Sequence, residues 1–239
     1  MCIRDRSKAN KEDRVVYRLK DEIDSFKEYL PLLRELANPA LQSRHWEQIF
    51  KEISKPYHQD VNFSIRKLIE YGILDHMEAV ENISGIASKE WSMLKTLQKM
   101  NKDWDGKEFM CMPYKDSGTF ILASTDDIQA ILDDQIVKIQ AMSASPFAKP
   151  FKDQVNDLET MMQTLQDLID NWLKCQQTWL YLEPIFSSED IVKQMPEEGS
   201  KFQEVDIMWR ELMSKTQENP IVVTIAKDTE NLEQLVRCN

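Results

Sequence analysis

The sequence predicts a mainly α-helical fold, an elongated multi-helix bundle with one small β-hairpin near residues 109–122. Three observations support this fold class. Apolar residues recur at steps of three and four over long stretches, which places them on one face of a helix. Only 5 Gly occur among 239 residues, which argues against an all-β or loop-rich architecture, and 42% of the residues are hydrophobic, enough for a packed core.

The clearest helical pattern covers residues 158–182. A helix of this length would extend about 37 Å at about 1.5 Å per residue. Pro184 predicts its end, because proline lacks the N–H that continues a helix. Ser187 and Asp190 then predict a capping box for a short helix. The apolar stripe of the long helix is called the seam and consists of Leu158, Met161, Leu165, Leu168, Trp172, Cys175, Trp179 and Leu182.

The chain before the hairpin divides at prolines and glycines. Pro31 is expected to break or kink the first helical pattern. Asn38 is expected to cap the next helix, with Pro39 at its first position. Gly106 follows the last residues of a long helical pattern and predicts its stop. The expected segments are helices over 15–37, 39–53 and 74–104 and a short apolar segment over 61–71.

The hairpin is predicted by two short apolar runs that flank residues 115–118. Pro113 would confine its strand to a sheet edge. Ser124 or Thr125 then caps a helix that ends near Ser143. The linker 143–150 leads into the seam helix, and further helices are expected over 188–194, 196–214, 221–226 and 229–236.

Composition excludes several partner classes. The formal net charge of −11 disfavours binding to nucleic acid and to anionic membranes. The four cysteines are far apart in sequence and predict free thiols, not a disulfide framework. No apolar run is long enough to span a membrane. Residues 1–14 lack a signal-peptide core and are expected to be a disordered or non-native leader, followed by one domain over 15–236 that stops before it is complete.

No catalytic motif stands out. The sequence contains no glycine-rich phosphate loop. His45 has no second ligand at metal-binding spacing, so it is expected to be a packed or surface residue next to Trp46 and neither a base nor a ligand. Neighbouring carboxylates such as Asp126 and Asp127 point about 100° apart on a helix and do not converge. We expect no catalytic, cofactor-binding or metal-binding residue here, which leaves a mechanical or an interaction element.

Several residue strings resemble the dynein heavy chain linker, the N-terminal region that precedes the motor ring. The most specific is WLKCQQTWLYLEPIFSSEDI at 172–191, followed by QMPEE at 194–198. The strings at 182–188 and 194–196 are similar to axonemal dyneins more than to the cytoplasmic motor. Others occur in the same order, namely NPAL at 38–41, RHW at 44–46, ASKE at 87–90, GTFIL at 118–122, DDI at 126–128, LDDQ at 132–135 and MSASP at 142–146.

The resemblance implies an α-helical lever that arches over a ring of AAA+ modules and bends as ATP turns over. It implies ATP and Mg sites in that ring, beyond Asn239, and none in this chain. The implied partners are the AAA+ ring of the same heavy chain, dynein intermediate and light intermediate chains, and the microtubule through the stalk. The implied location is the cytoskeleton of the cytoplasm and the axoneme of cilia or flagella.

A lever needs discrete hinges, and proline-marked breaks make Pro146, Pro150 and Pro184 the candidate hinges. The alternative is a non-motor helical adaptor or scaffold whose acidic surface binds a basic protein partner. A Walker motif downstream of this segment would favour the motor, and a stop codon after Asn239 would favour the adaptor.

Overall fold

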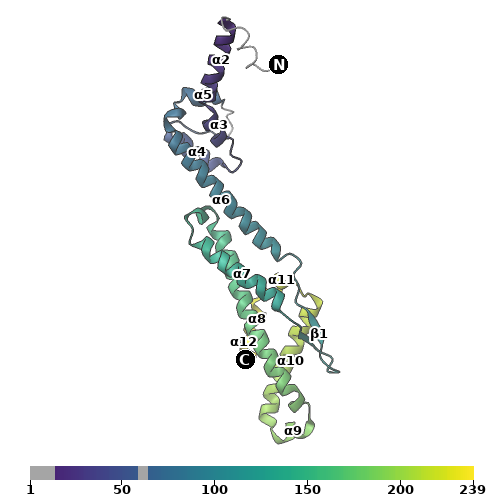
Figure 1. Ribbon diagram of the computed structural model, residues 1–239. Helices are drawn as coiled ribbons and strands as arrows, with labels where there is room; N and C mark the ends of the chain where they lie inside the picture. The colour runs from purple at the N-terminus through teal and green to yellow at the C-terminus, as the bar shows by residue number, and fades with distance from the viewer. Residues whose placement is uncertain (1–13, 59–63) are drawn as a thin grey trace. The chain divides into compact units, whose positions relative to one another are not determined.

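The computed structural model describes residues 14–58 and 64–239 (Figure 1). The chain forms two compact units, the first ending at Ser92 and the second running over Met93–Asn239. The described residues are mainly helical with one two-stranded antiparallel sheet, which confirms the predicted fold class. The predicted leader over residues 1–14 lies outside the described residues, apart from Arg14, which begins the first described helix. Residues 61–63 of the predicted apolar segment over 61–71 also lie outside them.

The first unit consists of short helices packed on the beginning of a long one. Pro31 lies in the first turn of α3, after a break at residues 28–29, as the sequence predicted. Gly72 has a φ of +78°, which L-residues rarely adopt. The elements are α2 (Arg14–Lys27), α3 (Leu30–Leu36), α4 (Ser43–Glu52), α5 (Ile65–Glu70), the 3₁₀ helix η1 (Ile73–His76) and the first part of α6 (Met77–Asp103).

The expected start of the helix at Pro39 is wrong. Asn38 and Pro39 lie in a turn, and Gln42 is the N-cap of α4. The reason is that the Asn38 side-chain oxygen accepts the Ala40 N–H at 3.0 Å, which stabilises a turn, while its amide nitrogen bonds to α6. The buried core of this unit consists of Leu32, Ile49, Phe50, Ile53, Leu68, Ile73, Val80 and Ile83.

The second unit begins with the end of α6 and the predicted hairpin. Strands β1 (Cys111–Pro113) and β2 (Phe120–Leu122) pair antiparallel, with Met112 opposite Ile121. Gly118 has a φ of +71° in the connecting turn. The chain then forms α7 (Asp126–Ser143), the 3₁₀ helix η2 (Pro146–Phe151), α8 (Lys152–Phe186), α9 (Glu189–Gln194), α10 (Pro196–Glu218), α11 (Val222–Lys227) and α12 (Thr229–Cys238).

Helix α8 is the central helix of the second unit and is longer than predicted. It begins before residue 158 and continues through Pro184, so the prediction that Pro184 ends the helix is wrong. A proline in the last turn removes only the hydrogen bond to the carbonyl four residues earlier, and the next turn closes through the Ser187 N–H, which donates to the Glu183 carbonyl at 2.9 Å. The capping box is also wrong, since Ser188 is the N-cap of α9 and makes no side-chain capping bond.

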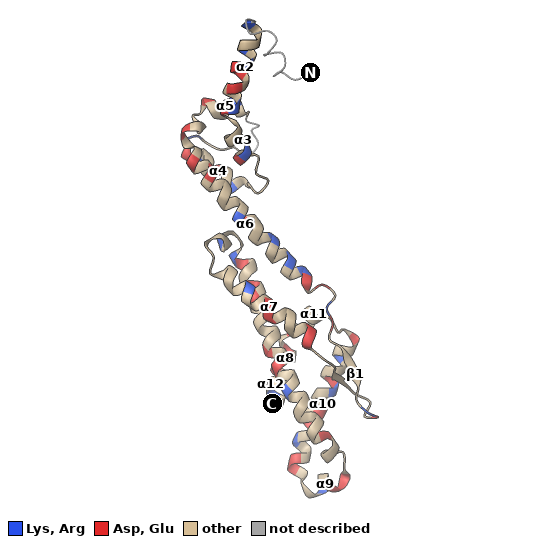
Figure 2. Ribbon diagram, viewed as in Figure 1, with Lys and Arg blue, Asp and Glu red and all other residues tan. Residues whose placement is uncertain are grey.

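The other helices of the second unit pack around α8. Helices α7, α10, α11 and α12 all contact it, and α7 lies beside it as the second arm of a helical hairpin closed by η2 (Figure 1). Acidic residues occupy the first turns of α9 and α10 (Figure 2), where the helix dipole stabilises negative charge. The largest fully buried side chains of the unit are Trp104, Trp172, Trp179 and Trp209.

Candidate functional site

Six of the eight seam residues are buried in α8. Met161 and Leu182 are only partly buried. Val155, Met162 and Ile169 are buried as well, although they are not part of the predicted seam. Because helices pack against α8 from several sides, the buried arc is wider than one stripe. The buried seam residues are Leu158, Leu165, Leu168, Trp172, Cys175 and Trp179.

Trp179 joins α8 to α10 and to the hairpin. Its ring stacks on Trp209 with centroids 5.4 Å apart, and Tyr114 meets it edge-on at 5.2 Å. Its Nε1–H donates to Asp206 Oδ1 at 3.0 Å. The buried ring therefore contributes packing and also satisfies its own polar atom.

Arg210 extends this contact to the turn of the hairpin. Its Nε donates to Asp206 Oδ2 at 2.8 Å, and its NH1 donates to the Ser117 carbonyl at 2.7 Å. The same carboxylate thus accepts from Trp179 and from Arg210. These bonds fix the hairpin on α10, and no local sequence signal links Ser117 to Arg210 across 93 positions.

Gln176 holds β2 against α8 through a pair of hydrogen bonds. The Leu122 N–H donates to Gln176 Oε1 at 2.7 Å, and Gln176 Nε2 donates to the Leu122 carbonyl at 3.0 Å. The side-chain amide thus takes the place of a neighbouring strand at this residue. A short two-stranded sheet has unpaired edges, so these two hydrogen bonds from Gln176 stabilise it.

A polar cluster in the first unit connects α4 with α6. His45 Nδ1 accepts the Gln42 N–H at 3.0 Å, so Nε2 carries the proton and donates to Glu90 Oε2 at 3.0 Å. Arg44 Nε donates to the same oxygen at 3.1 Å. Of the two environments expected for His45, packed or surface, the structure has the packed one, with the residue 1% exposed.

Asn38 makes a second contact from the turn before α4 to α6. Its Nδ2 lies 3.0 Å from the Ser84 carbonyl, 2.9 Å from Ser84 Oγ and 2.8 Å from Ser88 Oγ. The strings at 38–41, 44–46 and 87–90 are far apart in sequence, but their side chains meet at the interface between α4, the turn before it, and α6. We call Asn38, Arg44, His45, Ser84, Ser88 and Glu90 the α4–α6 cluster.

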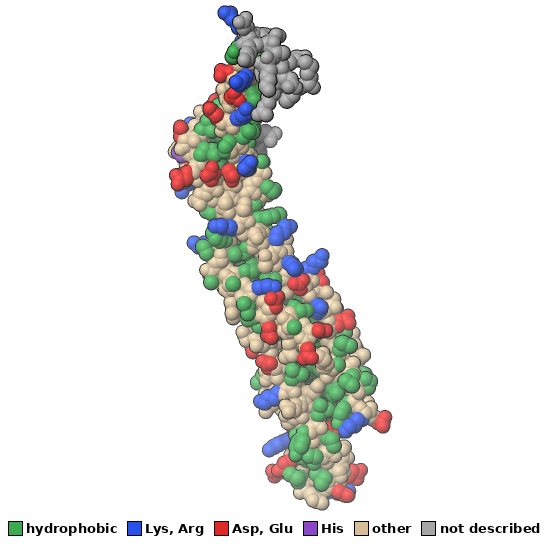
Figure 3. Space-filling model, in the orientation of Figure 1, with side chains coloured by type: hydrophobic (Ala, Val, Ile, Leu, Met, Phe, Trp, Pro, Cys, Tyr) green, Lys and Arg blue, Asp and Glu red, His purple; other side chains and the backbone are tan. Residues whose placement is uncertain are grey.

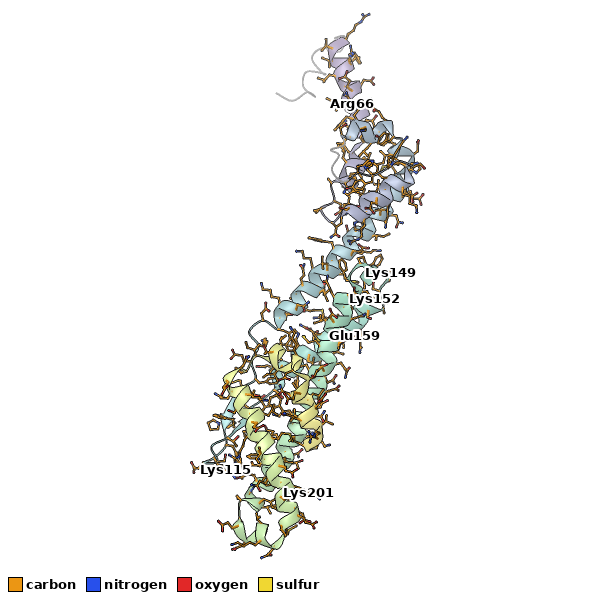
Figure 4. The ribbon with its side chains drawn as sticks, turned by 180° about the vertical axis from the view of Figure 1, so that it is seen from behind. Arg66, Lys115, Lys149, Lys152, Glu159 and Lys201 are labelled. Atoms are coloured by element: carbon orange, nitrogen blue, oxygen red, sulfur yellow. The ribbon has the colours of Figure 1, made fainter. Side chains whose placement is uncertain are left out.

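The proline-marked candidate hinges lie in two different environments. Pro146 and Pro150 belong to η2, where the neighbouring Ala148 and Phe151 are buried. Pro184 is exposed in the last turn of α8 and precedes α9, a helix that buries no residue. Lys149 and Lys152 mark the η2 corner in Figure 4.

Exposed apolar side chains occur on the hairpin and on α10. Met110 is 70% exposed and Ile207 is 52% exposed, and hydrophobic side chains gather near this end of the second unit in Figure 3. Met112 is also exposed. A group of exposed apolar side chains is typical of surfaces that contact another protein.

In ranges 14–58 and 64–239, no group of three His, Cys, Asp or Glu side chains is placed to hold a metal ion. The carboxylates of Asp126, Asp127, Asp133 and Asp134 are exposed on α7, and Asp134 pairs with Lys138. Within the same ranges, no helix combines the length and the apolar character that crossing a bilayer requires.

The sequence matches the family model described as "Dynein heavy chain, N-terminal region 2" over residues 2–239. It is 39% identical to dynein axonemal heavy chain 1 of Mus musculus over 221 residues, which are 92% of this chain and 5% of that protein. It is 41% identical to human dynein axonemal heavy chain 3 over 226 residues, or 95% of this chain and 6% of the relative.

A third relative is human dynein axonemal heavy chain 12, which is 44% identical over 199 residues, 83% of this chain and 6% of that protein. The chain thus spans only about one-twentieth of the length of the curated relatives it matches. Identity at this level over most of the chain, together with the match over residues 2–239, shows that the chain belongs to the dynein heavy chain family, within its N-terminal region 2.

Proposed function

We propose that this chain is the mechanical linker, or lever, of an axonemal dynein heavy chain. In this proposal the lever couples ATP-driven changes in an AAA+ ring to microtubule-based movement of cilia or flagella. The observation that carries the proposal is the family match over residues 2–239, with axonemal heavy chains among the relatives. ATP and Mg bind in the ring, outside this chain, and the chain itself is not catalytic.

The proposed partners follow from the family. They are the AAA+ ring of the same heavy chain, dynein intermediate and light intermediate chains, and the microtubule through the stalk. The exposed Met110, Met112 and Ile207 are the surface that we propose for contact with another part of the heavy chain, because burial of exposed apolar side chains favours association.

The packing of α8 supports a load-bearing role. A lever must resist bending, and a single helix bends more easily than one whose apolar side is packed along its length. Helix α8 has 35 residues and buries side chains from Val155 to Trp179 against α7 and the C-terminal helices. We therefore assign stiffness to α8 with its packed neighbours.

We place the bend at the corner between α8 and α9. Segments with few buried side chains open at low free energy, whereas packed turns are held by the core. Helix α9 buries no residue and Pro184 is exposed, but η2 is anchored by Ala148 and Phe151. Of the candidate hinges, Pro184 is therefore favoured over Pro146 and Pro150.

The first test removes the segment from the full-length heavy chain. Deleting residues 14–239 should abolish microtubule gliding and leave ATP hydrolysis by the ring measurable, because the ring remains but motion is no longer transmitted. Gliding at unchanged speed would contradict the lever and favour the adaptor. The readouts are gliding velocity and basal ATPase of the purified motor.

The second test addresses the bend in the same full-length motor. Pro184→Ala restores an N–H that can bond to the Leu180 carbonyl and should stiffen the end of α8. We expect gliding to slow by about twofold with basal ATPase unchanged, as for a change in a conformational step. The matched control is the double variant Pro146→Ala/Pro150→Ala, which should have the smaller effect. A larger effect of the double variant would move the bend to η2.

A further inference from the structure

Two cysteines far apart in sequence line one pocket in the second unit. Cys175 lies on the buried side of α8, one turn after Trp172, and is 2% exposed. Cys238 is in the last turn of α12, on the same helical face as the buried Asn231 and Leu235, and is half-buried against the same core. Both side chains line the same pocket between α8, α10 and α12.

The end of α12 is held in this position by separate contacts. Asn239 Nδ2 lies 3.0 Å from the Asn171 carbonyl and 3.3 Å from Asn171 Oδ1, one turn before Cys175 on α8. The juxtaposition of the two sulfurs therefore follows from how the helices pack. We propose that Cys175 and Cys238 are a peroxide-sensitive dithiol that closes to a disulfide between α8 and α12.

A pocket gives a small oxidant access to the pair. Both cysteines line a cavity of about 330 Å³ between α8, α10 and α12, walled by apolar side chains such as Leu182 and Phe202. Glu198 and Lys201 of α10 are the charged groups that line it, and Lys201 is marked in Figure 4. Hydrogen peroxide is small enough to enter a cavity of this volume.

The environments of the two thiols assign their roles. The neighbouring Cys175 thiol lowers the pKa of Cys238, and the charge of Arg237 adds to this against the opposing effect of partial burial. The neighbouring Cys238 and burial raise the pKa of Cys175. The thiolate is the nucleophilic form, so Cys238 is the cysteine that attacks peroxide and Cys175 is the cysteine that resolves the product.

The reaction balances with peroxide as the only oxidant. The Cys238 thiolate attacks one oxygen of hydrogen peroxide, the O–O bond breaks, and Cys238 sulfenic acid and hydroxide form. The Cys175 sulfur then displaces hydroxide from the sulfenic acid, its proton leaves with that hydroxide as water, and the S–S bond forms. In total the two thiols lose two protons and two electrons, and the peroxide accepts them and becomes two waters.

The test exposes the 239-residue chain to a slight excess of hydrogen peroxide and follows it by intact and peptide mass spectrometry. We expect a loss of two hydrogens that dithiothreitol reverses. Trypsin cleaves after Lys174 and Arg237, so the cross-link should appear as peptide 175–193 carrying the dipeptide 238–239. Because the disulfide closes a long loop, the oxidised chain should also melt about 5–10 °C higher than the reduced chain.

Matched variants separate this pair from the other thiols. Cys111→Ser should leave formation of the 175–238 cross-link unchanged, because burial raises the pKa of Cys111 and it has no cysteine partner among the described residues. Cys238→Ser should abolish the cross-link, and Cys175→Ser should stop the reaction at a sulfenic acid that dimedone traps on Cys238. Circular dichroism of each variant verifies folding.

Two results would overturn the proposal. One is oxidation of Cys111 as fast as Cys238, where we expect about a tenfold difference in favour of Cys238. The other is a product in which Cys238 gains oxygen atoms in the wild-type chain with no 175–238 peptide. The proposal does not depend on the lever, since all of these readouts use the isolated chain.

Discussion

The two units differ in what fixes their helices. In the first unit, the contact between α4 and α6 relies on the hydrogen bonds of Asn38, His45 and Glu90 as well as on a small apolar core. In the second unit, tryptophans on α8 and α10 stack within an extensive core, and the polar bonds of Asp206 and Gln176 lie around it.

The difference follows from helix length. A short helix such as α4 buries only a few side chains, so directional polar bonds help to define where it docks. A helix of 35 residues buries apolar side chains over many turns, and its packing alone selects the partners. Removing an aromatic contact of the second unit should therefore lower the free energy of unfolding more than removing a polar contact of the first unit. Each change should affect only the unit in which it lies.

The largest effect is expected for Trp179→Ala. Removing a fully buried indole that stacks on Trp209 should lower the free energy of unfolding by about 3–5 kcal/mol. Hydrogen exchange should show the loss in the second unit, with amides of α4 in the first unit unchanged. Trp179→Phe keeps a six-membered ring in the core and loses the rest of the indole and the bond to Asp206, so it should cost less than Trp179→Ala.

Tyr181→Ala is the control for this variant. Tyr181 is 72% exposed on the same helix and its removal should change stability by less than about 0.5 kcal/mol. Equal destabilisation by Trp179→Ala and Tyr181→Ala in denaturant titrations would contradict the assignment of the core to Trp179.

Glu90→Gln should have an intermediate effect, confined to the first unit. The change removes the charge that pairs with Arg44 and accepts from His45, and should cost about 2–3 kcal/mol. Amides of α4 should exchange faster, and those of α8 should not. Glu81→Gln, a change of an exposed residue on the same helix, is the control. If Glu90→Gln lowers the free energy of unfolding no more than this control does, the α4–α6 cluster adds nothing to stability.

Gln176→Ala should have the smallest effect of the three. It removes both bonds to Leu122 and should cost about 1–2 kcal/mol. The specific readout is the Leu122 amide, which should exchange with solvent faster than other amides of the second unit. The neighbouring exposed Gln177→Ala is the control. Unchanged protection at Leu122 would mean that pairing within the hairpin alone holds β2 in place.

Much of the fold could be predicted because its signals are local. The range of α7, the hairpin around 115–118 and the break at Pro31 were predicted from residues within a few positions of each feature. The errors at Pro39 and Pro184 arose where a local rule competed with other bonds. The Asn38 side chain accepts a hydrogen bond that stabilises the turn and donates one to α6. A proline in the last turn of a helix costs only one hydrogen bond.

By itself, the sequence determined the helical class, the main helices and the resemblance to the dynein heavy chain, because periodicity and short strings are properties of neighbouring residues. Only the tertiary structure decided which distant groups meet. His45 reaches Glu90 across 45 positions, Leu122 reaches Gln176 across 54, and Cys175 and Cys238 line one pocket. These pairs depend on how helices pack in three dimensions, and packing is set by the whole surface of each helix and not by any residue's neighbours in sequence.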